Sequence, residues 1–108
     1  MTADDFRQLA LALAGATESA HVGHPDFRAK GKIFATLQAD GHSGTVKLTP
    51  QLQQEVLQSN PEAFTPAAGA WGRRGWTNIH FDAADQPGAR AALQLAWRTV
   101  AARPSRSK

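Results

Sequence analysis

The sequence predicts an α+β domain in which an antiparallel sheet carries helices packed on one face. Apolar residues recur at helical spacing near both ends of the chain, and short alternating segments separated by glycine and proline lie between them. At 108 residues without cysteine, the chain has the length of one domain with one core. The expected order is helix, three or four strands, helix, long loop, strand and helix.

The first expected element is a helix at the amino terminus. Thr2 and Asp5 resemble the two ends of a capping box, and the apolar residues that follow, Phe6 and Leu9 among them, lie on one helical face. Gly15 is expected to end this helix. Its apolar face then needs the following strands as a packing partner.

Several short strands are expected next. Residues 19–22 form a possible edge strand, and a strand opening at Phe27 would place Arg28 and Lys30 on one face, before a turn at Gly31 and Lys32. The return strand is expected at residues 45–48, after a hairpin loop.

The strand between them, residues 33–39, has a clear alternation of side chains. This alternation predicts that Ile33 and Leu37 point into the core and that Phe34 points outward, with Thr36 and Gln38. Phe34 would then belong to a surface.

The second half begins with another helix. Thr49 is its expected N-cap, and the helix runs to about Ser59. Residues 64–74 read as a long loop because they contain proline, glycines and alanines, and loops of that length are often functional. A strand is expected at residues 76–81, and a final helix begins near Asp85.

The charge and the cysteine content of the chain limit the kinds of partner and cellular location to be expected. The net charge is +3 and the isoelectric point is near 10.0, which favours anionic partners. Part of the excess lies at the carboxyl end, so we expect residues 1–103 to form the domain and residues 104–108 a frayed basic tail. The cysteine-free composition and the acidic, amphipathic amino terminus favour a cytoplasmic protein without signal peptide or membrane segment.

No catalytic constellation is evident in the sequence. His21, His24 and Asp26 have a spacing that could suit a metal, but Pro25 interrupts them and no further strong ligand is evident. Most aspartates stand at helix starts and turns, and no phosphate-binding loop or nucleophile elbow appears. The sequence therefore predicts a protein that is not an enzyme and has no cofactor and no metal.

A basic and aromatic set of residues is the best candidate site. Rings stack bases and cations follow the phosphate backbone in sites for single-stranded nucleic acid. The simpler alternative is that most rings pack the core and that the arginines pack on tryptophans. The candidate cations are Arg28, Lys30, Lys32, Lys47, Arg73 and Arg74, and the candidate aromatic anchors are Phe34, Trp71 and Trp76.

The chain resembles the MmcQ/YjbR family of small bacterial proteins over nearly its whole length. The resemblance rests on residues 24–28 (HPDFR), 31–35 (GKIFA), 46–50 (VKLTP), 64–66 (FTP) and 72–75 (GRRG), with the tryptophans beside the last of these, and on Ala96, Trp97 and Arg98. Ala14 departs from the proline that commonly precedes Gly15 in the family.

This resemblance implies a fold like that of frataxin and its bacterial relative CyaY, and a DNA-binding label based on a proposed double-wing shape. It implies no catalytic residues. Iron handling of the frataxin kind depends on an acidic ridge on the first helix, and this chain has only Asp4 and Asp5 there. Iron donation is therefore not expected.

Two functions remain as hypotheses. The first is a nucleic-acid-binding domain whose partner is DNA or another polyanion. The second is a small-molecule or protein-interaction module that uses a pocket at Trp71 and Trp76, with Arg73 and Arg74 selecting an anionic group. An unpaired strand edge is compatible with either a monomer or a homodimer.

Overall fold

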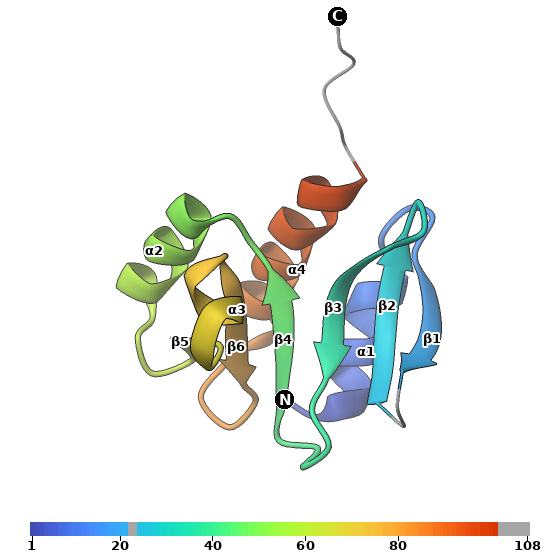
Figure 1. Cartoon of the computed structure of the whole chain (residues 1–108). Coiled ribbons are helices and arrows are strands. Elements are labelled where there is room, and N and C mark those ends of the chain that lie inside the picture. Colours follow the sequence, from blue (N-terminus) through green and yellow to red (C-terminus); the bar gives the residue numbers. More distant parts are fainter. Residues whose placement is uncertain (22–23, 102–108) are drawn as a thin grey trace, which may run out of the picture.

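The computed structural model describes residues 1–21 and 24–101, which form a six-stranded antiparallel sheet with four helices (Figure 1). The sheet order is β1-β2-β3-β4-β6-β5. The strands are β1 (Thr17–His21), β2 (His24–Ala29), β3 (Lys32–Leu37), β4 (Ser43–Lys47), β5 (Phe64–Pro66) and β6 (Trp76–His80), and the helices are α1 (Ala3–Leu11), α2 (Pro50–Ser59), α3 (Gly69–Arg73) and α4 (Gln86–Val100). The α+β class predicted from the sequence is confirmed.

The main core lies between the sheet and the pair α1 and α4, which cover the same face (Figure 1). Phe6 of α1 and Leu93 of α4 are fully buried there against Phe27 and Ile79 of the sheet. Burial of a side chain of this size contributes roughly 1.5–3 kcal/mol each. We call this the core face and the opposite side the open face.

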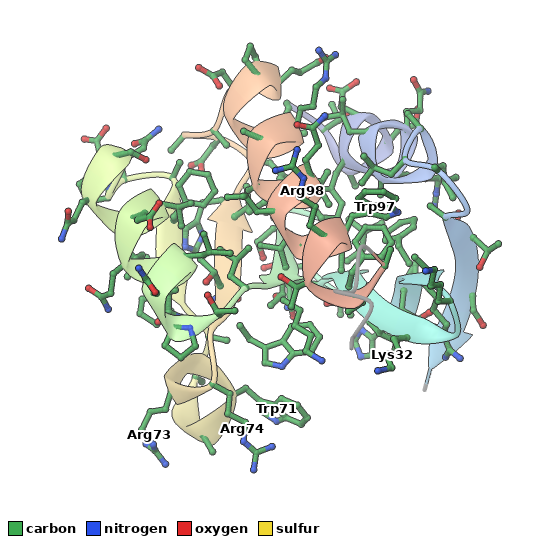
Figure 2. The ribbon with its side chains drawn as sticks, turned by 90° about the horizontal axis from the view of Figure 1, so that it is seen from above. Lys32, Trp71, Arg73, Arg74, Trp97 and Arg98 are labelled. Carbon is green, nitrogen blue, oxygen red and sulfur yellow. The ribbon has the colours of Figure 1, made fainter. Side chains whose placement is uncertain are left out.

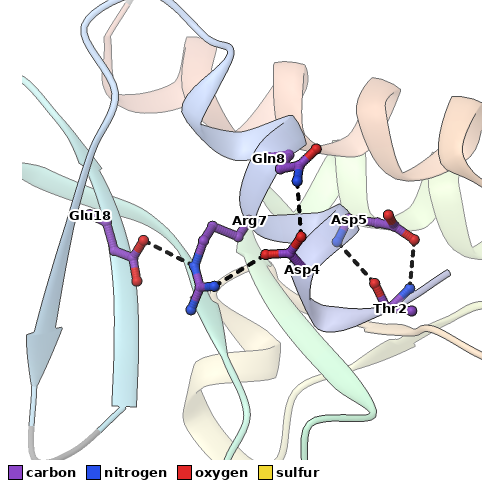
Figure 3. Close-up of polar contacts among 6 residues, drawn as sticks. All are labelled: Thr2, Asp4, Asp5, Arg7, Gln8 and Glu18. Carbon is purple, nitrogen blue, oxygen red and sulfur yellow. Dashed lines mark hydrogen bonds and ion pairs between the residues drawn. The ribbon is translucent and has the colours of Figure 1, made fainter.

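Helix α1 begins as its sequence predicts. Thr2 Oγ1 accepts from the backbone N–H of Asp5 at 3.1 Å, and Asp5 Oδ2 accepts from the backbone N–H of Thr2 at 2.9 Å (Figure 3). Arg7 then lies between Asp4 of the same helix and Glu18 of β1, at 3.3 and 3.1 Å. These pairs are largely solvent-accessible and contribute little free energy.

Two boundaries at this end differ from the sequence prediction. Helix α1 ends at Leu11, before Gly15, which stands in the following turn with a left-handed φ of 71°. The edge strand is β1, and it begins at Thr17, two residues earlier than expected.

The expected orientation of Phe34 is wrong. Phe34 is fully buried, whereas Ile33 is only half-buried. The cause is a β-bulge: Arg28 pairs with Ile33 and Phe27 with Ala35, so Phe34 is an extra residue on β3. The bulge shifts the alternation of side chains by one residue. Phe34 therefore points into the core, and Ile33, which was expected there, lies on the open face.

The turn between β2 and β3 lies one residue earlier than expected. Lys30 is in the turn with a left-handed φ of 53°, Gly31 follows with φ of 77°, and Lys32 already belongs to β3. Lys30 therefore does not share a strand face with Arg28, and this prediction is wrong.

The stretch predicted as a long loop contains two elements. Phe64–Pro66 is strand β5, which pairs with β6, and Gly69–Arg73 is helix α3. Figures 1 and 2 show α3 on the open face, away from α1 and α4. The predicted order therefore lacks a strand and a helix, and the helices do not all pack on one face.

The starts of the other two long helices are confirmed. Thr49 Oγ1 caps α2 through the N–H of Leu52, and Asp85 Oδ1 caps α4 through the N–H of Gly88. The expected tail, residues 104–108, lies outside the residues that the structure describes.

Candidate functional site

All six predicted cations lie at the same end of the sheet. Strand β2 ends and β3 begins at this end of the sheet. Strand β4 also ends there, at Lys47, which pairs with Trp76 at the start of β6. Helix α3 ends with Arg73 just before β6, beside this upper end of the sheet in Figure 1. We call it the basic end. It comprises Arg28, Lys30, Lys32, Lys47, Arg73 and Arg74.

The six cations differ in how freely they can contact a ligand. Lys30, Lys32, Arg73 and Arg74 are exposed, and among residues 1–21 and 24–101 they form no ion pair; Lys47 is half-buried. The cations without an ion pair thus lie in the β2–β3 turn, at the start of β3 and at the end of α3.

Arg28 is held by a buried carboxylate. Its Nε and Nη2 donate to the two oxygens of Asp26 at 2.9 and 3.2 Å, and the Asp26 side chain is only 2% exposed whereas that of Arg28 is 34% exposed. The hydrogen bond and the charge of Asp26 raise the pKa of Arg28 above its ordinary value. Arg28 is therefore permanently charged but partly neutralised.

Two tryptophans and an arginine pack against one another at the side of the basic end formed by α3 and β6. The rings of Trp71 and Trp76 lie perpendicular, with centroids 5.8 Å apart, and the guanidinium of Arg74 lies 5.8 Å from the centroid of Trp71. Trp71 is 59% exposed, and Figure 2 shows Trp71 and Arg74 projecting from α3 while Arg73 points away from them. We call Trp71 and Trp76 the aromatic corner.

The aromatic corner is one wall of a groove of about 860 Å³ on the open face. Ile33 lies at the β3 side, and Ala67 and Ala68 continue the wall of the corner. Both sides of the groove are therefore apolar.

The floor of the groove is polar and carries no cation. The lining side chains there come from alternate positions of β3, β4 and β6 and from the turn that follows β3: Thr36, Gln38, Asp40, Ser43, Thr45 and Asn78. Gln38 donates to the hydroxyl of Thr45, which donates to Asn78 Oδ1 at 3.0 Å. Neither the Thr36 nor the Ser43 hydroxyl has a hydrogen-bond partner among the described residues, so both are available to a ligand.

Charge is separated along the groove. Asp40 follows β3 at the end opposite the basic end, and Asp82 and Asp85 lie in the connection between β6 and α4 at that same end (Figure 1). An anionic group is therefore attracted to one end of the groove and repelled from the other.

The structure separates the predicted aromatic anchors. Trp71 and Trp76 face the groove, as the pocket hypothesis expects, but Phe34 is part of the core and is not a site residue. Arg73 and Arg74 stand beside the groove rather than in its lining. In the pocket hypothesis these arginines would therefore contact an anionic group at the rim of the groove and not inside it.

Sequence reasoning missed the floor of the groove. Ser43 and Thr45 are buried polar residues and Asn78 is half-buried, and all three alternate along their strands with residues that face the core. Polar residues on one face of a central strand are the signal that could have found them, because central strands buried on both faces are usually apolar throughout.

The histidines do not assemble a site. Within the described residues no group of three or more histidine, aspartate or glutamate side chains could hold a metal ion. His80 Nε2 lies 2.8 Å from Thr65 Oγ1 on the open face, and the backbone N–H of His42 donates to Asp40. In the part of the chain that the structure describes, no helix has the length and apolar character needed to cross a membrane.

Comparisons with known proteins bear on the family. The model of the YjbR family matches residues 11–99. The crystal structure of the Deinococcus radiodurans protein DR2400, with a domain named DUF419, is similar with a TM-score of 0.75 and 18% sequence identity, over 91% of this chain and 77% of that one. No curated protein matches the sequence. Because the family model covers most of the domain, including the basic end and the groove, the chain belongs to the YjbR family.

Proposed function

We propose that this protein binds nucleic acid at the basic end and does so without catalysis. The observation that carries the proposal is the convergence of six cations from three separate segments, residues 28–32, 47 and 73–74, on one end of the sheet. Phosphates bound by lysine and arginine release counterions, and this release supplies most of the sequence-independent affinity of such proteins.

The position of the groove supports the same proposal. Each of its three large apolar residues has a cation beside it: Arg28 pairs with Ile33, Lys47 pairs with Trp76, and Arg74 lies over Trp71. A ligand that lies along this rim meets positive charge and aromatic surface together, which is the combination that single-stranded nucleic acid requires.

The test is a fluorescence-anisotropy titration of labelled single- and double-stranded DNA across a salt series. We expect saturable binding that weakens with salt. Replacing both Arg73 and Arg74 by alanine is expected to reduce the slope of log affinity against log salt by about 1.4, because each phosphate contact on a single strand contributes about 0.7.

Two controls accompany the titration. Arg90→Ala removes an exposed cation near the start of α4, away from the basic end, and is expected to leave the slope unchanged. A chain truncated after Ala102 is expected to bind as the intact chain does. Loss of binding on truncation would assign the affinity to the terminal residues and contradict the proposal.

A second candidate is a small-molecule or protein-interaction module. The groove of about 860 Å³, with apolar walls and a polar floor, favours it, since ligand pockets commonly have this size and composition. Binding of a small ligand with no response to DNA would favour this candidate over the first.

Further proposals concern the setting of the protein. We propose a cytoplasmic, bacterial protein, supported by a cysteine-free composition and by the bacterial source of the similar structure. The frataxin-like topology expected from the family resemblance also remains a proposal. We also propose that the protein is a monomer or a homodimer that pairs through the exposed edge strand β1, and sedimentation distinguishes the two.

A further inference from the structure

We propose that the groove receives one unpaired nucleobase of a single strand while the neighbouring phosphates lie on the basic end. This inference rests on the proposed function and specifies its substrate. It follows from the division of the site into a charged rim and an uncharged interior.

The interior excludes a phosphate. No lysine or arginine lines the groove, and its one charged lining residue is Asp40. A phosphate inside would lose its hydration without gaining a cation and would approach a carboxylate. The part of the ligand that enters the groove is therefore neutral, whereas the part at the rim is anionic.

The aromatic corner favours a planar group. Trp71 and Trp76 stand at 84° to each other, so a ring that lies flat on one indole meets the other edge-on. Both arrangements are favourable for aromatic pairs. The exposure of Trp71, 59%, leaves surface on which a ring can stack.

The floor matches the edge of a base. Three groups of the floor have no hydrogen-bond partner among the described residues: the amide oxygen of Gln38 and the hydroxyls of Thr36 and Ser43. The Asn78 amide is bonded to Thr45 and to the carbonyl oxygen of Pro66. Amides and hydroxyls both donate and accept hydrogen bonds, as the edges of bases do. In a duplex these edges are paired and the ring faces are stacked, so only an unpaired base can use the floor and the corner together.

The inference is tested with two phosphodiester strands of equal length, one an oligothymidylate and the other carrying sugars without bases. We expect the oligothymidylate to bind the intact chain at least tenfold more tightly, because stacking of one base on an aromatic side chain accounts for about that factor or more. Equal binding of the two strands would overturn the inference while the proposed function stands. Binding of neither strand at low salt would overturn the proposed function itself.

Variants locate the base. Trp71→Ala is expected to weaken oligothymidylate binding about tenfold and to leave binding of the base-free strand unchanged, whereas Trp71→Phe restores most of the affinity. Leu11→Ala, at another exposed large apolar residue, is the matched control and is expected to change neither. An equal effect of Trp71→Ala on both strands would overturn the placement of the base.

A second variant does not depend on the tryptophan. Thr36→Val keeps the size of a groove side chain and removes its free hydroxyl, and it is expected to weaken only oligothymidylate, by about fivefold. Thymidine monophosphate serves as a further probe. If this nucleotide bound saturably and oligothymidylate did not bind, the base in the groove would belong to a free nucleotide and the inference would be overturned.

Discussion

At the scale of single residues, burial separates the aromatic side chains into two roles. Phe34 and Trp71 both looked like surface anchors in the sequence, yet Phe34 is fully buried and Trp71 is 59% exposed. Phe34 is buried because one extra residue on β3 reverses its direction. Trp71 lies on α3, which the bulge does not affect, and remains free to bind.

Phe34→Ala is expected to lower the free energy of unfolding by about 3–5 kcal/mol, because it leaves a cavity in the core. Ile33→Ala, at the adjacent half-buried position, is expected to cost clearly less. Urea unfolding followed by circular dichroism measures both. Equal losses would mean that Phe34 does not fill the core as described.

At the scale of elements, the placement of α3 depends on one buried glutamine. Gln53 of α2 donates through Nε2 to the carbonyl oxygens of Gly72 and Trp76, both at 3.0 Å, and the residue is buried. The glutamine therefore links α2, α3 and the start of β6, which together carry the aromatic corner.

Gln53→Ala is expected to lower the free energy of unfolding by about 1–3 kcal/mol, because it removes two hydrogen bonds from a buried position. The carbonyl oxygens of Gly72 and Trp76 keep their backbone donors, Gly75 and Ala67. Gln54→Ala, an exposed neighbour on the same helix, is the matched control with little effect. Thermal unfolding reports the difference. A similar small effect of both variants would show that Gln53 does not hold α3 in place.

Gly72 places α3 close to the chain that precedes it. A Cβ atom at this position would lie 1.9 Å from the carbonyl oxygen of Ala67, so Gly72→Ala must displace the helix. The expected cost is about 1–3 kcal/mol. Gly69→Ala tests the alternative cause, since Gly69 has a φ of 67° but open space around its Cβ. If the cost at position 69 were the larger, backbone strain rather than close packing would dominate in α3.

At the scale of the whole molecule, the two ends of the sheet have different chemistry. The six cations of the basic end are lysines and arginines, while the pair His21 and His24, together with His42 and His80, lies toward the opposite end. Histidine is the side chain whose charge ordinarily changes between pH 5 and 8. Among the described residues, no histidine lines the groove or belongs to the basic end.

We therefore expect nucleic-acid affinity to change little between pH 6 and pH 8. The pKa of Arg28 is raised by its hydrogen bond to Asp26 and by the charge of Asp26. Because this pKa is raised, Arg28 keeps its full positive charge at every pH below the ordinary pKa of arginine and loses it only above that pKa. Anisotropy titrations at constant ionic strength measure the affinity. A strong fall over this range would place a histidine in the site.

Much of the fold follows from local signals in the sequence. Thr49 and Asp85 mark the starts of α2 and α4 because capping depends on a few adjacent residues, and the long apolar pattern of α4 is unambiguous. The α+β class, the family resemblance and the set of cations could all be read without coordinates. Strand β5 and helix α3 could not be read from the sequence, because segments of three and five residues are too short to show a repeating apolar pattern.

The sequence by itself determined the kinds of side chain available for binding: six cations in three segments, with a tryptophan on either side of one of them. Only the tertiary structure decided that the cations meet at one end of the sheet, that Phe34 leaves the surface and that neutral residues of β3, β4 and β6 form the floor of a groove. The physical reason is that register, bulges and strand order depend on pairing between distant segments, whereas composition and capping depend on neighbours along the chain.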